Sequence, residues 1–149
     1  MTQSHMTETI IGKQVEPFTL PNHNNLAHSL NQLRDEQGIL IGLCHDIWDI
    51  SAIRHVLWFQ RHVHKLSYNH IGAALIMPTH AHELNGFYLS IPRQITFPLL
   101  ADYKRETFAM FGIESSGFVA LDGDNVVRKR WFMQNNGVPH MRDVLNTLK

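Results

Sequence analysis

The sequence predicts an α/β fold in which a central mixed β-sheet is flanked by α-helices. Residues 38–44 and 72–77 are short apolar runs, typical of strands buried on both faces, and a long amphipathic segment separates them. A strand, a helix and a second strand in this order favour parallel pairing through a right-handed crossover. Farther along, two strand-like segments flank residues 122–125, whose sequence Asp-Gly-Asp-Asn indicates an antiparallel hairpin. Parallel and antiparallel pairs together make the predicted sheet a mixed one.

The length and composition of the chain fit one globular domain. Its 149 residues are enough for a hydrophobic core, and the apolar fraction of 44% is ordinary for such a protein. Residues 1–11 are polar and unpatterned, so we expect a flexible N-terminal segment followed by a single domain over residues 12–149.

The charge pattern argues against several classes of partner. Thirteen basic and thirteen acidic residues balance without a run of like charge, so no positive field attracts nucleic acid or an anionic membrane. The apolar runs are too short to span a bilayer, and the first residues lack the apolar core of a signal peptide. We therefore expect a cytoplasmic protein that binds neither nucleic acid nor membranes.

The segment before the first buried strand predicts an edge strand and a short helix. Residues 15–20 alternate weakly between apolar and polar side chains and are closed by turn-forming residues, as in an edge strand followed by a hairpin or loop. Ser29 is suited to be the N-cap of a short helix that directs Leu30 and Leu33 inward. Gly38 then marks the break before the buried strand.

The strongest periodic segment predicts a long amphipathic helix packed on the sheet. Its apolar stripe consists of Ala52, Val56, Phe59, Val63 and Leu66. Ile53 and Leu57 lie on the flank of this stripe. The opposite face carries Arg54, Arg61 and Lys65. Asp49 falls in the first turn, where the positive end of the helix dipole favours an acidic side chain.

Three further helices and the hairpin complete the predicted order. Residues 81–89 follow a proline that stops the second buried strand, and they are predicted to form a short helix. A second short helix is predicted over residues 104–111, ended by a glycine. Residues 117–121 and 126–133 form the hairpin strands, and the apolar stripe of residues 138–148 predicts a final helix.

Four segments, in order, are similar to signatures of one protein family. They are Gly12 with Pro17-Phe18-Thr19-Leu20-Pro21, Ser29-Leu30-x-x-Leu33, Phe97-Pro98-Leu99-Leu100-Ala101-Asp102 with Phe111-Gly112-Ile113, and Phe118-Val119-Ala120-Leu121-Asp122-Gly123-Asp124. The chain therefore resembles the peroxiredoxins of the alkyl hydroperoxide reductase and thiol-specific antioxidant type, which are redoxins of the thioredoxin-fold superfamily. The resemblance covers nearly the whole chain from Gly12 onward and implies a thioredoxin fold.

The positions that carry chemistry in that family differ in this chain. The peroxiredoxin loop after the central strand reads P-x-x-x-T-x-x-C, and its matching positions here are Cys44, Trp48 and Ser51. A serine hydroxyl is scarcely ionised at neutral pH and forms no sulfenic acid, so it cannot replace the thiol that attacks peroxide. The activating arginine of peroxiredoxins and the cis-proline of thioredoxins both align with Ser115 or Ser116. The resemblance thus implies a degenerate active site at Trp48, Ser51 and Ser116.

The first functional hypothesis is a non-catalytic module that uses this former active-site surface for binding. The partner would be a second copy of the chain, giving a homodimer, or another protein. Trp48 stands at the entrance of the long helix with Ile47 and Ile50 nearby, a group typical of an exposed apolar patch at an interface. The alternative is that Trp48 is folded inward as a core residue.

The second hypothesis is a one-cysteine thiol peroxidase, an antioxidant oxidoreductase in which Cys44 reacts and an external reductant regenerates it. Cys44 lies at the carboxyl end of a buried strand, where ligand sites of α/β sheets occur, and His45 follows it. A free cysteine at the end of an apolar strand is more often inert core, and we favour that interpretation. As the only cysteine, it excludes a C-x-x-C pair and an internal disulfide.

The third hypothesis is hydrolytic. Ser51 would be the nucleophile, with His55 one turn along the same helix as its base and Asp46 or Asp49 nearby. The alternative is that Ser51 satisfies backbone groups in the first turn of the helix.

The eleven histidines predict neither a metal site nor a cofactor. His62 and His64 point in nearly opposite directions on the predicted helix, and His55 is two turns from His62. His80 and His82 fall in a loop or a first helical turn, where the pattern sets no geometry. We expect these histidines to face solvent or to be satisfied individually.

Overall fold

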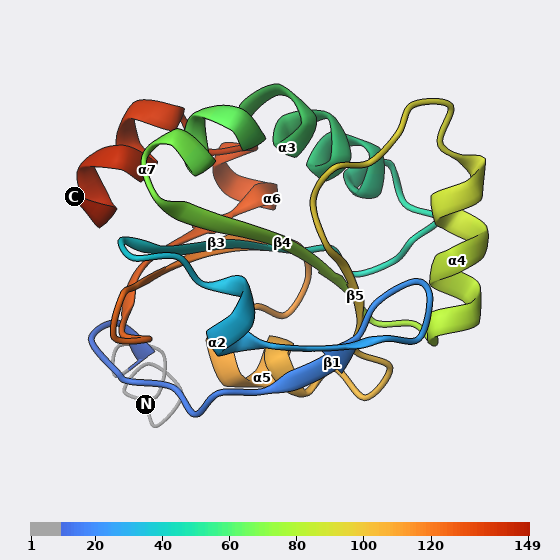
Figure 1. Ribbon diagram of the computed structural model, residues 1–149, viewed down its shortest axis with the longest axis horizontal. Coiled ribbons are helices and arrows are strands. Elements are labelled where there is room, and N and C mark those ends of the chain that lie inside the picture. Colours follow the sequence, from blue (N-terminus) through green and yellow to red (C-terminus); the bar gives the residue numbers. More distant parts are fainter. Residues whose placement is uncertain (1–9) are drawn as a thin grey trace.

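The computed structural model describes residues 10–149 and has the predicted α/β architecture (Figure 1). The strands are β1 Thr19–Pro21, β2 Ala27–Ser29, β3 Gly38–Leu43, β4 Ile71–Met77, β5 Leu99–Ala101, β6 Gly117–Asp122 and β7 Val127–Phe132. The helices are α2 Leu30–Leu33, α3 Ile50–Tyr68, α4 Ala81–Ser90, α5 Glu106–Phe111, α6 Met133–Asn136 and α7 Met141–Leu148. Of the expected flexible segment, only Ile10 and Ile11 fall within the described residues, and Ile10 packs against the core.

The central sheet is mixed. β3 pairs antiparallel with β6, and β6 pairs antiparallel with β7, so the predicted hairpin is confirmed. β4 pairs parallel with β5, as two strands joined by a helix should. β4 lies beside β3, where the Cys44 amide donates to the Ile76 carbonyl over 3.0 Å. β4, β3 and β6 are therefore the three central strands, each with a neighbouring strand on both sides.

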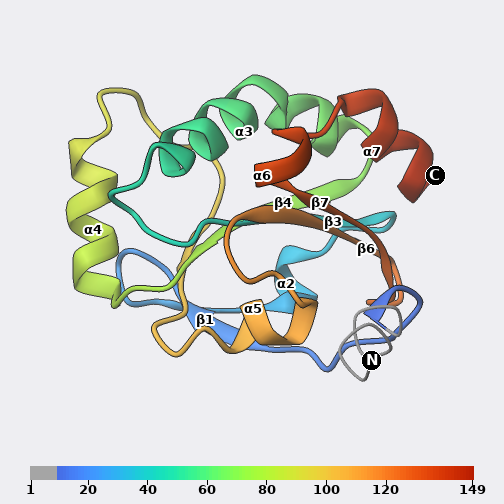
Figure 2. The same ribbon diagram turned by 180° about the vertical axis from the view of Figure 1, so that it is seen from behind.

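Helices cover the sheet on its two faces (Figures 1 and 2). α3 and α7 lie on one face, while α2 and α5 lie on the other. The side chains of β3 alternate between the two layers: Leu40 and Cys44 belong to the core under α3, and Ile39 and Ile41 belong to the core above α5. This alternation explains why the strand reads as a continuous apolar run, since both of its faces are buried.

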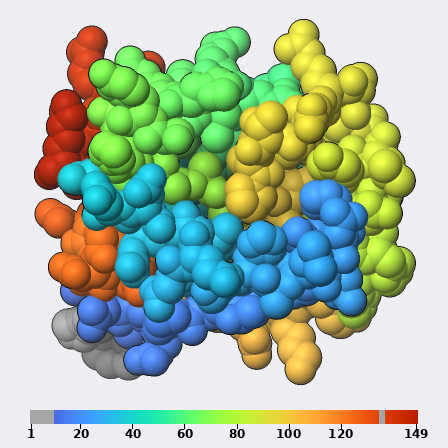
Figure 3. All heavy atoms as spheres, viewed as in Figure 1, coloured from blue at the N-terminus to red at the C-terminus, as the bar shows by residue number. Residues whose placement is uncertain are grey.

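The N-terminal hairpin closes the edge of the sheet beside β5. β1 pairs antiparallel with β2, and Asn22 bridges to Leu100 of β5. Figure 3 shows this segment, in blue, spread across the lower part of the face in view. Ser29 caps α2 in a reciprocal arrangement with Gln32, which confirms the predicted N-cap. The edge strand was predicted to begin at residue 15, whereas β1 begins at Thr19, so residues 15–18 lie outside the paired segment.

The long helix forms as predicted and begins at its acidic residue. Asp49 is the N-cap of α3, and its carboxylate accepts the Ser51 amide over 3.0 Å. The helix buries the predicted stripe, although Val63 is only partly buried. His55 and Trp58 are also buried, outside the predicted stripe, whereas Ile53 and Leu57 on its predicted flank are exposed. The covered face of α3 is therefore displaced from the predicted one. None of the helices among residues 10–149 has the length and apolar character needed to cross a membrane.

Candidate functional site

The sheet register brings the candidate site together. In the antiparallel pair of β3 and β6, Leu43 lies opposite Gly117. Cys44 and Ser116 are the next residues outward on these two strands, so they meet beyond the end of the sheet. The first turn of α3 returns over the same point and adds Ser51. The structure thus brings together Cys44, Ser51 and Ser116, three positions that the family resemblance singled out.

Hydrogen bonds link these three side chains. The Cys44 Sγ lies 3.3 Å from the Ser51 Oγ, and the Ser51 Oγ lies 3.2 Å from the Ser116 Oγ. The Ser116 hydroxyl also accepts the His45 amide over 3.0 Å. The three side chains are buried: Cys44 is 0% exposed, and the two serines are nearly as well covered. We call these three residues the buried cluster.

The environment of Cys44 favours the thiol over the thiolate. Burial raises its pKa above the ordinary value, and the nearby Asp49 carboxylate raises it further. The Ser51 hydroxyl lowers the pKa, but this opposes a larger desolvation effect. The thiol also donates to the Asp46 carbonyl over 3.3 Å. A thiolate has no proton to donate, so its negative charge would lie against the lone pairs of this oxygen. Reactive cysteines have the reverse arrangement, with partial exposure and a cation beside the sulfur.

One cation stands at the rim of this site, and it comes from a segment that the sequence did not single out. Arg105 donates from Nη2 to the Glu114 carbonyl over 2.8 Å and from Nη1 to the His45 carbonyl over 3.4 Å. Its guanidinium also lies over the Phe108 ring, 4.4 Å from the centroid. These contacts hold the loops around the buried cluster. None of these three contacts is to the Cys44 sulfur.

The hydrolytic arrangement is not formed. His55 is fully buried, and its ring nitrogens face two carbonyl oxygens: Nδ1 lies 2.8 Å from that of Ser51 and Nε2 lies 3.0 Å from that of Gly117. Its ring therefore contacts the backbone of Ser51 and leaves the Ser51 hydroxyl without a base.

His45 cannot act as the base of a triad either. Its Nδ1 lies 3.1 Å from the Ser116 Oγ and 4.0 Å from Asp49, whereas a catalytic triad uses opposite nitrogens for the serine and the acid.

Burial has a direct effect on His55. It lowers the pKa below the ordinary value for histidine, while the two carbonyl partners raise it less. The ring also stacks on Phe118, with centroids 4.6 Å apart. Gly42 of β3 leaves the room for this ring, since a Cβ atom there would lie 2.8 Å from the His55 Cδ2 atom. The neutral ring carries one N–H, so it donates to only one of its two carbonyl neighbours. His55 is thus a buried histidine of the core.

The surface beside the buried cluster is apolar and open. Trp48 is 79% exposed and Ile50 is 76% exposed, so the core interpretation of Trp48 is wrong. Ile47, which the sequence placed in the same patch, is buried in the core under α3 and does not contribute. On the first two turns of α3, Ile53 and Leu57 are 43% and 55% exposed and extend the patch. We call Trp48, Ile50, Ile53 and Leu57 the apolar patch.

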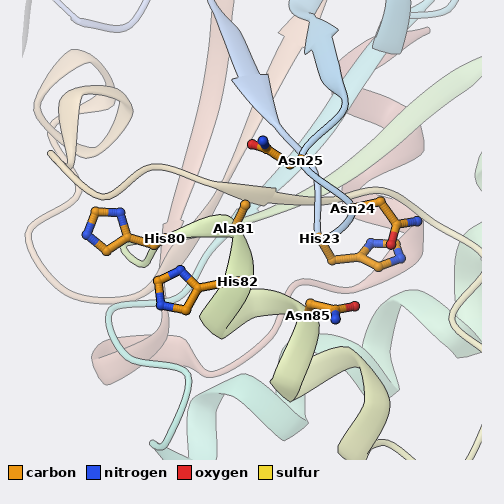
Figure 4. A pocket seen from close by; sticks show the side chains of 7 residues that line it. All are labelled: His23, Asn24, Asn25, His80, Ala81, His82 and Asn85. Atoms are coloured by element: carbon orange, nitrogen blue, oxygen red, sulfur yellow. The ribbon is translucent and has the colours of Figure 1, made fainter.

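A separate pocket gathers histidines at the start of α4 (Figure 4). It has a volume of about 540 Å³ and is lined by His23, Asn24, Asn25, His80, Ala81, His82 and Asn85. The His80 ring stacks on Tyr103 at 3.7 Å and lies 5.7 Å from the His82 ring. Figure 4 shows His23 away from this pair, beside Asn24. Within residues 10–149, no group of three or more His, Cys, Asp or Glu side chains is arranged to hold a metal ion.

Comparison with solved structures identifies the fold. The chain superposes on peroxidoxin BcpB from Mycobacterium tuberculosis with a TM-score of 0.80 and 17% identity, over 93% of this chain and 95% of that one. It matches reduced 2-Cys peroxiredoxin from Plasmodium vivax with a TM-score of 0.74 and 12% identity, covering 93% and 94% of the two chains. This chain has a peroxiredoxin-like thioredoxin fold. AhpC from Mycobacterium tuberculosis matches this fold with a TM-score of 0.75 at 11% identity, over 93% of this chain and 90% of that one. No protein-family model and no curated protein matches the sequence.

Proposed function

We propose that this protein is a thioredoxin-fold binding module without thiol peroxidase activity, which uses the apolar patch to bind protein. The observation that supports this most directly is the contrast at the start of α3. The only cysteine is 0% exposed, while Trp48, four residues later, is 79% exposed. A peroxide needs access to a thiolate, and a protein partner needs accessible apolar surface.

The state of Cys44 argues against the one-cysteine peroxidase. Its sulfur is enclosed and has a raised pKa, and its hydrogen bonds use the Asp46 carbonyl and the Ser51 hydroxyl. At Ser51, the position of the missing thiol, a hydroxyl cannot be oxidised through the sulfenic acid route. Neither position is therefore suited to reduce peroxide, because the Cys44 thiol is buried and Ser51 has an oxygen where the reaction needs a sulfur.

The apolar patch supports the binding role. Large apolar side chains that remain exposed beside one another cost free energy in water, and interfaces concentrate tryptophan at their centre. A homodimer through this patch is one form of the proposal, and another protein is the second. We place this activity in the cytoplasm, as the sequence predicts.

Peroxide consumption tests the absence of catalysis. The wild-type protein and Cys44→Ser are incubated with hydrogen peroxide and dithiothreitol, and the loss of peroxide is followed over time. We expect the two proteins to consume peroxide at the same background rate. Rapid consumption by the wild type that is lost in Cys44→Ser would establish the one-cysteine peroxidase instead.

Sedimentation velocity tests the form of the binding role. If the partner is a second copy, the wild type sediments as a dimer and Trp48→Ala sediments as a folded monomer. If the partner is another protein, both sediment as monomers. A dimer that survives Trp48→Ala would place self-association elsewhere on the molecule.

A further inference from the structure

The outer face of α3 continues beyond the apolar patch and changes character along the helix. Ile50, Ile53 and Leu57 follow one another at spacings of three and four, so they form one stripe on the side of α3 that faces away from the sheet. In Figure 1 this side of the helix forms the upper boundary of the molecule. Arg61 and Lys65 continue the same stripe toward the C-terminal end of the helix, and both are exposed.

The basic residues of this face form no ion pair with an acidic residue in the described part of the chain. Arg54, Arg61 and Lys65 take part in none of the ion pairs found among residues 10–149. The sequence explains why: it has no acidic residue between Asp49 and Glu83. Although the charge of the whole chain is balanced, α3 therefore carries a local excess of cations. The nearest acidic residues in sequence, Asp46 and Asp49, precede the helix.

We propose that this outer face binds an acidic amphipathic helix of a partner protein. The inference rests on the proposed binding role of the apolar patch and adds the chemistry of the partner. Apolar residues of the partner helix would pack on Ile50, Ile53 and Leu57, as in other helix-in-groove and helix-on-helix contacts. Its carboxylates would pair with Arg54, Arg61 and Lys65, which makes the two surfaces complementary in charge.

The length of the face suits a helical partner. The 19 residues of α3 span roughly 28 Å at the rise of an α-helix. Arg61 and Lys65 follow the apolar residues along this length, while Arg54 lies beside Ile53 in the apolar half. A partner helix therefore needs mainly apolar residues in one half and acidic residues in the other. The exposed surface is a helix and offers no unpaired strand edge, so an extended peptide would gain no backbone hydrogen bonds here.

A second copy of the chain suits the same face less well. Two α3 helices side by side in a parallel arrangement would place cations against cations. In an antiparallel arrangement, Arg61 and Lys65 of each copy would lie against the apolar half of the other, where charged groups lose hydration without gaining a counter-charge. An acidic helix avoids both costs.

The test is selection from a display library of random 16-residue peptides on the immobilised wild-type protein, followed by fluorescence anisotropy with the enriched peptides. We expect enriched peptides that combine apolar residues at helical spacing with an excess of Asp and Glu. We expect the double variant Arg61→Glu/Lys65→Glu to weaken their binding at least tenfold, and Leu57→Asp to do the same. Lys13→Glu/Lys104→Glu, at two exposed lysines outside α3, makes the same change in net charge; it is the matched control and should leave binding unchanged.

The outcomes separate this inference from the proposed function. Enriched peptides that are neutral or basic, and whose binding is lost in Leu57→Asp, would overturn the acidic partner and leave the binding role standing. A wild-type dimer that Leu57→Asp dissociates would name a second copy as the occupant and overturn the inference in the same way. No enrichment, or peptides whose binding none of the α3 variants changes, would overturn both. Circular dichroism of each variant confirms that it is folded.

Discussion

The buried cluster and the apolar patch lie within a few residues of each other and differ in almost every property. The buried cluster of Cys44, Ser51 and Ser116 is enclosed, polar and internally hydrogen-bonded. The apolar patch is open, and its side chains come from the loop before α3 and from the first turns of that helix. At the place where related folds carry chemistry, the accessible surface of this chain is apolar and the sulfur is enclosed.

The difference follows from the direction of side chains on one helix. Ser51 points toward the sheet end, whereas Ile50 and Ile53 on either side point to solvent. A substitution on the inner side should therefore change stability, and one on the outer side should change only binding. Four predictions test this division, in order of decreasing effect.

The largest effect is expected for Phe59, and Leu57, two residues earlier on the outer face of α3, is its control. Phe59 is 0% exposed and packs on Phe97 and Phe118. We expect Phe59→Ala to lower the free energy of unfolding by about 3–5 kcal/mol, and Leu57→Ala to change it by less than about 0.5 kcal/mol. Urea denaturation measures both. Equal losses would show that the outer face of α3 is not a free surface.

A smaller loss is expected for the buried cluster itself. Ser116→Ala removes the acceptor of the His45 amide and the partner of the Ser51 hydroxyl. Buried polar groups left without partners should lower the free energy of unfolding by about 1–3 kcal/mol in urea denaturation. Ser115→Ala, one position earlier and only partly buried, is the control. If the two variants are equally stable, the hydrogen bonds of the cluster contribute nothing.

The third prediction concerns pH and His55. Burial lowers the folded-state pKa of His55 below its unfolded value of about 6.5, so the unfolded chain takes up this proton first. The stabilisation is present above the unfolded pKa and is lost as the pH falls from there toward the folded pKa. This group contributes at most about 1.4 kcal/mol per pH unit in that window. Urea denaturation between pH 7.5 and 5 should show a weaker pH dependence for His55→Gln.

The control for this prediction is an exposed histidine of the same helix, His64. His64→Gln should keep the wild-type pH dependence of stability. A slope that disappears in His64→Gln and persists in His55→Gln would contradict the assignment.

The smallest effect on stability is expected for Trp48→Ala. Trp48 is 79% exposed, so its removal should change the free energy of unfolding by less than about 0.5 kcal/mol. Acrylamide should quench Trp48 readily in the wild type, and this quenchable fluorescence should be lost in Trp48→Ala. Trp58 is buried, with its indole donating to the Pro139 carbonyl, so Trp58→Phe should leave the quenchable fraction in place. Resistance of Trp48 to quenching would mean that another surface covers it.

The sequence predicted the fold well where a single physical signal dominates. The buried run of β3, the periodicity of α3 and the turn residues of the β6–β7 hairpin each predicted their element. β5 was missed, because Leu99–Ala101 is too short for a pattern of its own and forms a strand only by pairing with β4. α6 was missed as well, since four residues carry no helical period.

The candidate site was predictable in its membership and not in its geometry. The family resemblance pointed to Cys44, Ser51 and Ser116, and the register of β3 and β6 brings them together. Arg105 was missed because its contact with the His45 carbonyl joins two loops far apart in the sequence. The sequence also did not predict which apolar side chains are exposed. Ile47 and Trp48 are adjacent and both apolar, and only the course of the backbone determines that Ile47 is buried and Trp48 is exposed.

The measurement that tests the central claim most directly is the rate at which Ellman's reagent labels Cys44 in the native protein at neutral pH. The reference is an accessible thiol at an exposed position of α3, Ser67→Cys in a Cys44→Ser background. We predict that native Cys44 reacts at least about a hundredfold more slowly than this reference, the ratio given by an opening free energy of about 3 kcal/mol, and that both react alike in denaturant. Native labelling of Cys44 at the rate of the reference or faster would contradict the account, because it would mean that the sulfur is open to solvent and ionised.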